Sequence, residues 1–382
     1  MWIPYGKQTL SEEDIQEVVA VLKGDFITQG PKVKEFEEAL CSYCGARYAV
    51  VFSSGTSALH GAYHAAGIRE NDAVITSPMT FAATANAALY LGANVIFVDV
   101  DERTGNILPS SIEEKITRST RALVPIDYAG HPVELEAIQE IARKYGLLVI
   151  EDACHSLGAS YRGKKIGSLS DMTIFSFHPV KSITTGEGGA VLTDRTDLYE
   201  NLLQFRTHGI TKEPRKFAVP SHGNWYHEMQ MLGYNYRLTD IQCALGTSQM
   251  RRLDAFIQRR REIAAMYRKA FEGNPYFDVP QEKEDVVSAW HLYPIRFKDG
   301  YKEKKARIVE KLHERGIGVQ VHYLPVYLHP YYRQLGYEEG LCPKAEDFYR
   351  RELGIPIFPS LKDEEIERVV QTLLNVCEEE KP

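Results

Sequence analysis

Residues 147–155 read Leu-Leu-Val-Ile-Glu-Asp-Ala-Cys-His, and this stretch decides the predicted fold. Four apolar residues followed by two acids are typical of a buried parallel strand that ends at the carboxyl edge of its sheet. Ligands bind at that edge in open α/β folds. Asp152 is therefore a candidate binding residue. Taken alone, a carboxylate that caps the following turn explains the pattern equally well.

On both sides of this stretch, short apolar segments alternate with helical patterns. Such alternation implies crossover connections and a mostly parallel sheet that is buried on both faces. One helix is expected to start at residues 11–14 and stop at Gly24, and a second to open at Pro31 and close at Gly45. Further helices are expected over residues 81–91, 109–116 and 134–145, and the expected strands cover residues 48–52, 73–76, 94–98, 122–126, 147–151, 173–177 and 190–193.

The pattern changes after Leu238. One long helix is expected from about residue 238 to about residue 271, because the helical spacing continues until Gly-Asn-Pro at 273–275. The remaining residues show fewer strands and more charge. We therefore predict a large α/β domain over residues 1–247 and a smaller α+β domain over residues 248–382.

The composition excludes several classes of protein. The 382 residues include 52 acidic and 45 basic side chains, and the resulting net charge of −7 gives no general attraction to nucleic acid. No apolar run approaches the roughly 18 residues of a membrane span. Six cysteines are too few for a disulfide scaffold, so we expect a cytoplasmic protein. Cys41-x-x-Cys44 lacks a second cysteine pair, and no metal site is predicted.

Lys181 lies in an unusual position, in a turn between the apolar segment 173–177 and the glycine-rich segment 186–189. A lysine that forms a Schiff base needs a short, fixed tether and a partly desolvated amine. Taken alone, Lys181 is more simply a structural residue. Together with Asp152 on a neighbouring strand edge, it fits a pyridoxal phosphate (PLP) site. In such a site the lysine holds the aldehyde and the acid keeps the pyridine nitrogen protonated.

A candidate phosphate site follows the first strand. Residues 53–57 read Ser-Ser-Gly-Thr-Ser and open a helix, whose free N–H groups favour an anion. A plain N-cap is the simpler alternative for this segment alone. Phe81 offers a flat face for a cofactor ring, although a core aromatic is the default interpretation.

These segments together carry a resemblance that runs along nearly the whole chain. They resemble the DegT/DnrJ/EryC/StrS family of nucleotide-sugar aminotransferases, which are PLP enzymes of fold type I, like aspartate aminotransferase. The segments that carry the resemblance are Ser54-Gly55-Thr56-Ser57-Ala58, Glu151-Asp152-Ala153, Phe175-Ser176-Phe177-His178, Lys181, Gly186-Glu187-Gly188-Gly189 and Gly233-Tyr234-Asn235-Tyr236-Arg237-Leu238.

The resemblance implies a role for each matching position. Lys181 would bind PLP as a Schiff base and move the proton, Asp152 would pair with the pyridinium nitrogen, and His155 would lie near the ring hydroxyl. Asn235 would reach into the site of a neighbouring subunit, so that a homodimer with shared active sites is implied. Arg237 would meet an anionic substrate group. The residues implied to bind the cofactor are Gly55, Thr56, Phe81, Asp152, His155, Ser176, Lys181 and Asn235.

Further segments resemble family members of pseudaminic acid biosynthesis. These segments are Tyr5, Asp25–Gly30, Asp127–Gly130, Lys181–Thr185 and Gln320–Pro325. This likeness implies that L-glutamate donates its amino group to the C4 ketone of a UDP-linked 2-acetamido-2,6-dideoxy-hexos-4-ulose. The implied substrate-binding residues are Tyr5, Phe26, Ile27, Thr28, Gly55, Ser176, Asn235, Gln320, Val321, His322 and Tyr323.

Two alternatives stay open. Residues 209–233 form a long polar and aromatic insertion just before Asn235, which would reshape the nucleotide side of the site. A different 4-keto nucleotide sugar, of the perosamine or 4-amino-arabinose type, is therefore one alternative. The other is a non-catalytic PLP-binding regulatory protein, which the presence of Lys181 disfavours.

Overall fold

The computed structural model describes residues 2–381 and is built around one seven-stranded sheet. Strand β9 is antiparallel to both of its neighbours, and the other strands share one direction. The predicted α/β class with a mostly parallel sheet is thus confirmed. In spatial order the strands are β1 (Tyr48–Phe52), β9 (Gly189–Thr193), β8 (Met172–Ser176), β5 (Leu148–Asp152), β4 (Thr120–Val124), β2 (Ala73–Thr76) and β3 (Asn94–Phe97).

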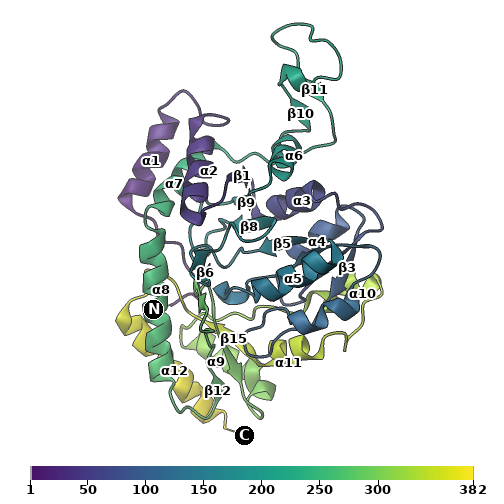
Figure 1. Ribbon diagram of the computed structural model, residues 1–382. Helices are drawn as coiled ribbons and strands as arrows, with labels where there is room; N and C mark the ends of the chain where they lie inside the picture. The colour runs from purple at the N-terminus through teal and green to yellow at the C-terminus, as the bar shows by residue number, and fades with distance from the viewer. Residues whose placement is uncertain (1, 382) are drawn as a thin grey trace.

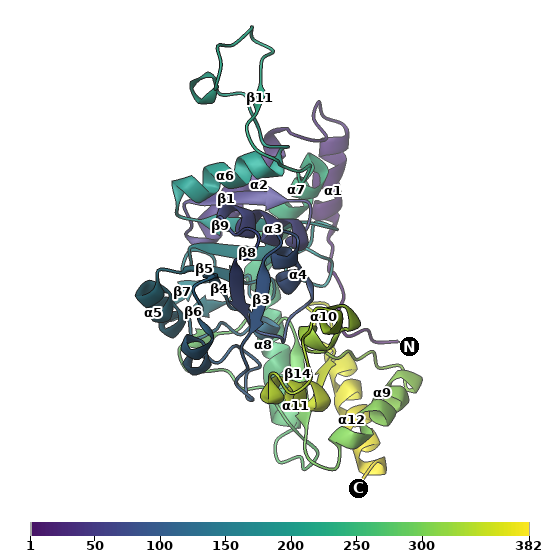
Figure 2. The same cartoon turned by 90° about the vertical axis from the view of Figure 1, so that its right-hand side faces the viewer.

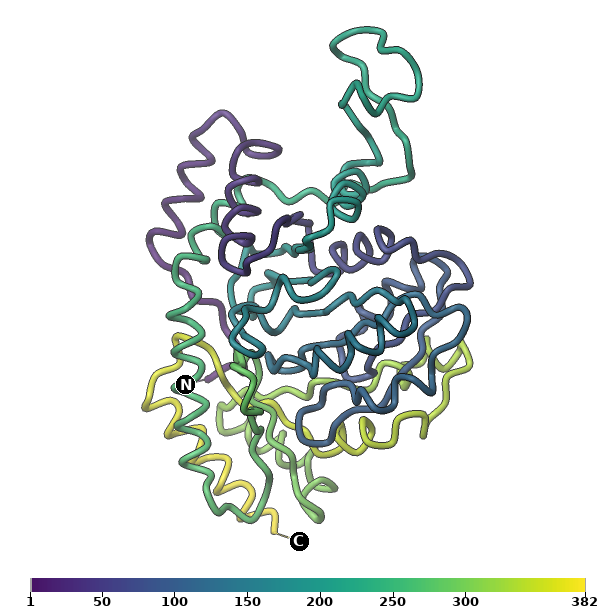
Figure 3. Tube along the Cα trace, in the orientation of Figure 1, coloured from purple at the N-terminus to yellow at the C-terminus, as the bar shows by residue number. Residues whose placement is uncertain are grey.

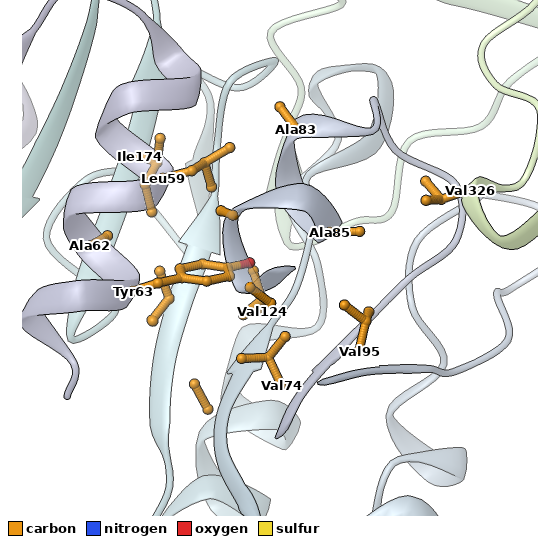
Figure 4. Packing of buried hydrophobic residues seen from close by; sticks show 14 of the residues in the cluster. Leu59, Ala62, Tyr63, Val74, Ala83, Ala85, Val95, Val124, Ile174 and Val326 are labelled. Atoms are coloured by element: carbon orange, nitrogen blue, oxygen red, sulfur yellow. The ribbon is translucent and has the colours of Figure 1, made fainter. Parts of the chain in front are cut away.

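Helices cover both faces of this sheet, which explains why its strands are apolar throughout (Figure 1). One face packs against α3 (Gly55–Ala65), α4 (Ala83–Leu89) and α6 (Thr196–Arg206). The close view of this core shows Tyr63 of α3 among residues of α4 and the strands (Figure 4). The other face packs against α2 (Pro31–Cys44), α5 (Leu135–Tyr145), α7 (Asp240–Met250) and α8 (Leu253–Ala270).

A second core forms where α8 meets the C-terminal part of the chain. Its three-stranded sheet has the order β12 (Phe277–Asp278), β14 (Tyr293–Phe297), β15 (Glu352–Ile355). Ile3 joins this core and pairs with Ile317. The predicted boundary at 247/248 falls inside α7, and the division into two domains stays a prediction. The remaining helices here are α9 (Lys305–Glu314), α10 (Pro330–Gln334), α11 (Pro343–Arg351) and α12 (Asp363–Glu379).

The insertion at residues 209–233 extends away from the body of the protein as a hairpin (Figures 2 and 3). Its strands are β10 (Ile210–Thr211) and β11 (Glu228–Met229), and α1 (Glu12–Leu22) lies toward the same end of the molecule (Figure 1). A third small sheet joins β13 (Val286–Val287), β6 (Ser160–Tyr161) and β7 (Lys164–Lys165). Over residues 2–381, the structure contains no helix that is both long and apolar enough to cross a membrane.

Two helix predictions were wrong. The long helix expected over residues 238–271 is two helices, because the backbone leaves helical geometry at Arg252. Arg252 pairs there with buried Asp14 of α1, so a tertiary contact overrides the local helical pattern. Residues 109–116 form two short 3₁₀ turns, η1 (Pro109–Ser111) and η2 (Glu113–Lys115), instead of one α-helix. Ile116 is already extended, so no further helical turn follows.

Candidate active site

Asp152 ends strand β5 at the carboxyl edge of the sheet, as predicted. Its side chain is 5% exposed. Thr84 Oγ1 donates a hydrogen bond of 2.6 Å to Asp152 Oδ2, and the backbone N–H of Cys154 donates one of 3.2 Å to Oδ1. Tyr63 Oη in turn donates to the carbonyl oxygen of Thr84. These buried contacts fix the orientation of the carboxylate.

Lys181 lies in the turn after β8, where its N–H donates to the carbonyl oxygen of His178 over 2.9 Å. The side chain is partly buried, and the loss of hydration lowers the pKa of its amine. The charges of Cys154 and Asp152 oppose this shift. A lysine whose pKa is lowered keeps more of the neutral, nucleophilic amine at a given pH.

The N-terminus of α3 lies next to the ends of β8 and β9. Ser54 caps the helix in a reciprocal arrangement with Ser57, and the first N–H groups of the helix have no intrahelical acceptor. The approach is close, since a Cβ on Gly55 would lie 3.0 Å from the side chain of Ser176, and one on Gly189 would lie 2.5 Å from the carbonyl oxygen of Ser54. Glycine at these two positions therefore allows the anion site to form beside β8.

These elements surround a cavity of about 530 Å³. Asp152, Lys181 and the N-terminus of α3 all contribute to its wall, so the structure brings the separate sequence signals together in one place. The predicted site residues that line this cavity are Tyr5, Gly55, Thr56, Phe81, Asp152, His155, Ser176, Lys181, Gln320, Val321, His322 and Tyr323.

His155 lies in this wall beside two groups from the C-terminal part of the chain. Its Nε2 is 3.2 Å from the hydroxyl of Tyr323, and its ring centroid is 4.4 Å from that of His291. His155 Nδ1 is buried without a hydrogen-bond partner. Burial, followed by the charge of Lys181, lowers the pKa of His155 and His291 well below the usual value. The same causes lower the pKa of His322 to about 3. These imidazoles are therefore neutral at physiological pH.

Among the lining residues that the sequence analysis missed, three contact a predicted site residue: Thr84, Cys154 and His291. Thr84 follows Phe81 closely in the chain, but nothing in its local pattern signals a contact with Asp152. Cys154 lines the cavity, and its backbone N–H holds Asp152. His291 lies far from the other site residues in sequence, so only the tertiary structure places it against His155.

Four predicted site residues do not line this cavity. Phe26 and Ile27 are 58% and 52% exposed, and Thr28 pairs instead with Thr239. Asn235 is exposed and pairs with Thr207 at the base of the hairpin. Their predicted roles in binding stay predictions, and within one chain their side chains remain on the outer surface.

Arg237 lies at a separate, smaller pocket of about 250 Å³, which also includes Gln29, Gly30 and Thr207. Arg206 in the same pocket is neutralised by Glu37 at 2.6 Å. Arg237, by contrast, makes no ion pair or hydrogen bond through its guanidinium to any part of the chain that the structure describes. It is therefore a free cation on the same surface as the exposed loop 25–28.

The cavity fits PLP chemically. It offers a buried carboxylate for the pyridinium nitrogen and a lysine with a lowered pKa for the aldehyde. The unpaired N–H groups at the N-terminus of α3 suit the phosphate. The unpartnered Nδ1 of His155 gives a further polar atom toward a ring substituent.

Comparison with known proteins agrees with this geometry. The model of the DegT/DnrJ/EryC1/StrS aminotransferase family matches residues 8–374. A relative from Campylobacter jejuni, the UDP-4-amino-4,6-dideoxy-N-acetyl-beta-L-altrosamine transaminase, is 43% identical, and the match covers 99% of this chain and 98% of that protein. The solved structure of Helicobacter pylori PseC, an aminotransferase involved in the biosynthesis of pseudaminic acid, superposes with a TM-score of 0.93 at 37% identity, over 99% and 100% of the two chains.

A further solved structure is that of Spr1654 from Streptococcus pneumoniae, a sugar aminotransferase crystallised in PLP and PMP forms. It is 29% identical with a TM-score of 0.93, and in its PLP form the match covers all of both chains. The fold and the site thus define a PLP-dependent aminotransferase. The chain belongs to the DegT/DnrJ/EryC1/StrS family, that of the sugar aminotransferases.

Proposed function

We propose that this enzyme transfers the amino group of L-glutamate to the C4 ketone of a UDP-linked 2-acetamido-2,6-dideoxy-hexos-4-ulose, giving UDP-4-amino-4,6-dideoxy-N-acetyl-β-L-altrosamine. The relative from Campylobacter jejuni that carries this name and the PseC structure support the choice of substrate. The observation that carries the reaction class is the cavity in which Lys181, Asp152 and the N-terminus of α3 meet.

PLP, when bound, supplies an electron sink for the carbon that exchanges the amino group. The N–H groups at the start of α3, with Ser176, would bind its phosphate, and Asp152 would hold a proton on its pyridine nitrogen. Thr84 and the Cys154 N–H fix the Asp152 carboxylate for this role. Phe81 would contact the ring face, and His155 would lie on its hydroxyl side.

Lys181 moves the proton in this mechanism. Its Nζ takes a proton from the donor carbon of glutamate, and later delivers one to C4 of the sugar. The pKa of the amine, lowered by burial, allows both directions, because a catalytic group transfers protons best when its pKa approaches the ambient pH. Tyr5 and the segment 320–323 line the side of the cavity that is left for the sugar.

The charges of the substrates indicate a second subunit. Glutamate carries two carboxylates and the sugar nucleotide carries a diphosphate. Among the described residues that line the cavity, however, Lys181 is the only lysine and there is no arginine. Arg237 and Asn235 lie outside it on an exposed surface, together with Phe26 and Ile27. We infer a homodimer in which this surface completes the active site of the partner subunit.

Exposed apolar side chains support the same assembly. On the hairpin, Trp225 is 78% exposed, Met229 is 62% exposed and Leu232 is 70% exposed. Large apolar groups gathered on a projecting segment mark an interaction surface more often than a solvated one. The hairpin and the loop 25–28 lie toward the same end of the molecule (Figure 2).

Two measurements test the proposed function. Addition of glutamate to the purified, PLP-loaded enzyme should bleach its visible absorbance, and an unchanged spectrum would contradict glutamate as donor. Three keto sugars are then assayed side by side: the UDP-linked 2-acetamido-2,6-dideoxy-hexos-4-ulose and the precursors of perosamine and of 4-amino-arabinose. A higher kcat/KM for either precursor would overturn the proposed acceptor while leaving the reaction class intact.

A further inference from the structure

A second large hollow, of about 810 Å³, is lined by the C-terminal end of α8. This end of the helix points away from α7 (Figure 1). Its walls come from the end of α8, from β12 and β14, and from the turn that contains Arg103. None of its lining residues lines the candidate active site. We call it the basic crevice, after the five cationic side chains in its wall: Arg103, Arg268, Lys269, Arg296 and Lys298.

The cations of the basic crevice outnumber its carboxylates, which are Glu272 and Asp278. This local excess is notable in a chain with a net charge of −7. Arg296 and Lys298 each reach Asp278 only at 4.0 Å. The Arg103–Asp101 pair is 3.7 Å long. Like charges gathered in a concave site attract an anion from solution.

The two cations at the end of α8 have even weaker counter-charges than these three. Over the described part of the chain, Arg268 and Lys269 form no ion pair, and the guanidinium of Arg268 lies 6.0 Å from the ring centroid of Trp290. By contrast, Arg351 in the same C-terminal part pairs with Asp299 at 2.7 Å. The weakly paired cations of the basic crevice are therefore a local feature, since other cations of this part of the protein have close partners.

Arg296 is the most deeply placed of the five. Only 15% of its side chain is exposed, its Nη1 donates to the carbonyl oxygen of Glu102, and its Nε is buried without a partner. Burial lowers the pKa of this guanidinium. Burying a guanidinium is unfavourable, and Asp278 at 4.0 Å offsets this cost only weakly, so an external anion at this position would stabilise the folded protein.

We propose that the basic crevice binds an anionic ligand of nucleotide size that carries a diphosphate group. Guanidinium groups match phosphate oxygens with paired, charge-assisted hydrogen bonds. The volume lies within the range of small-molecule sites and exceeds what a single phosphate fills. Val279 is the partly exposed apolar residue of the wall, and the uncharged portion of the ligand would pack on it.

Isothermal titration of the PLP-loaded enzyme with inorganic diphosphate and with UDP tests the proposal. The double variant R268S/K269S removes two exposed cations, and the matched control R118S/K164S removes the same charge outside the crevice. We expect R268S/K269S to weaken diphosphate binding at least about tenfold, while the control binds as the wild type does. Circular dichroism and thermal melting verify that both variants fold.

The two titrants separate the sources of the ligand. If the basic crevice, whose binding is lost in R268S/K269S, binds UDP more tightly than diphosphate, its ligand is a nucleotide. If it binds both with equal affinity, the crevice recognises the diphosphate group alone. The proposal is overturned if neither titrant binds the wild type outside the active site, or if R268S/K269S and R118S/K164S bind both titrants equally. Failure of the proposed transaminase reaction would leave these titrations unaffected, because no variant here touches the active-site cavity.

Discussion

Two halves of the candidate active site differ in how they are built. The half around β5, β8 and α3 is largely buried, and its groups contact one another within a single chain. The other half consists of the exposed loop 25–28, the exposed Asn235 and the half-buried Arg237, and it lines no part of the same cavity. The difference indicates that the groups around Lys181 and Asp152 are assembled by the folding of one chain, and it supports the proposal that recognition of the charged substrate depends on a second chain.

Removal of Lys181 should have the largest effect on the buried half. We expect Lys181→Ala to abolish the visible absorbance of bound PLP and to reduce turnover by at least about 10⁴-fold, because no other lysine lines the described cavity. The exposed Lys164→Ala variant serves as the control and should keep both properties. A turnover of Lys181→Ala within tenfold of that of the wild type would contradict the central role of Lys181 in the buried half of the site.

The carboxylate contacts allow a graded test. Asp152→Asn removes the charge while keeping the shape, and we expect kcat to fall about 10²–10³-fold. Thr84→Val leaves the carboxylate but removes its 2.6 Å hydrogen bond, and should lower kcat by about tenfold or somewhat more, since a hydrogen bond to a charged group contributes about 1.5–3 kcal/mol. Equal losses in both variants would mean that Thr84 is not merely a support for Asp152.

The exposed half is tested by complementation. Arg237→Ala should raise KM for the sugar nucleotide by about 10–100-fold, because a charge-assisted contact with the partner's substrate is lost. Mixing inactive Lys181→Ala with Arg237→Ala under subunit exchange should then restore up to about a quarter of wild-type activity. Heterodimers in such a mixture contain one site with both side chains intact. No recovery on exchange would place Arg237 in the site of its own chain.

Removal of the carboxylate that supports segment 320–323 from behind should have a smaller effect. Glu352 Oε2 accepts the backbone N–H of His322 at 2.8 Å, and burial raises the pKa of this carboxyl to about 8. Glu352→Leu leaves that N–H unpaired, and we expect KM for the sugar to rise about fivefold to tenfold with little change in kcat. Glu352→Gln keeps an acceptor and should restore KM. A Gln variant as impaired as Leu would exclude this positioning role.

The pH dependence of stability distinguishes a buried histidine from an exposed one. The pKa of His322 falls to about 3 in the folded protein and is about 6.5 when unfolded. Between these values only the unfolded chain binds the proton. The free energy of unfolding should therefore decrease as pH falls below about 6.5, by about 1.4 kcal/mol per pH unit for this group.

Urea denaturation between about pH 7 and about pH 5 measures this slope. His322→Gln should reduce the slope by the equivalent of one proton. His222→Gln, in the exposed hairpin, should leave it unchanged. Equal slopes for the wild type and His322→Gln would show that His322 is accessible to water.

Much of the fold was predictable because local and tertiary preferences agree there. The strands at residues 48–52 and 73–76 have the predicted bounds, since apolar runs between turn residues have few alternatives inside a two-sided sheet. The predictions failed where a distant contact decides the backbone, as at Arg252, whose partner is Asp14. Helix 109–116 failed because only Pro109 and Ile112 are buried there, which leaves little buried apolar surface to sustain a further helical turn.

The residues of the sequence by themselves predicted a PLP site, and the resemblance that they carry to the aminotransferase family implied the reaction class. Asp152, Lys181 and the Ser-Gly-Thr turn are motifs of fixed local geometry, at strand ends that a parallel sheet must place along one edge. Only the tertiary structure showed that Thr84 holds Asp152, that His291 packs against His155, and that Asn235 lies outside the cavity. These facts depend on contacts between segments far apart in the chain, and no local pattern encodes them.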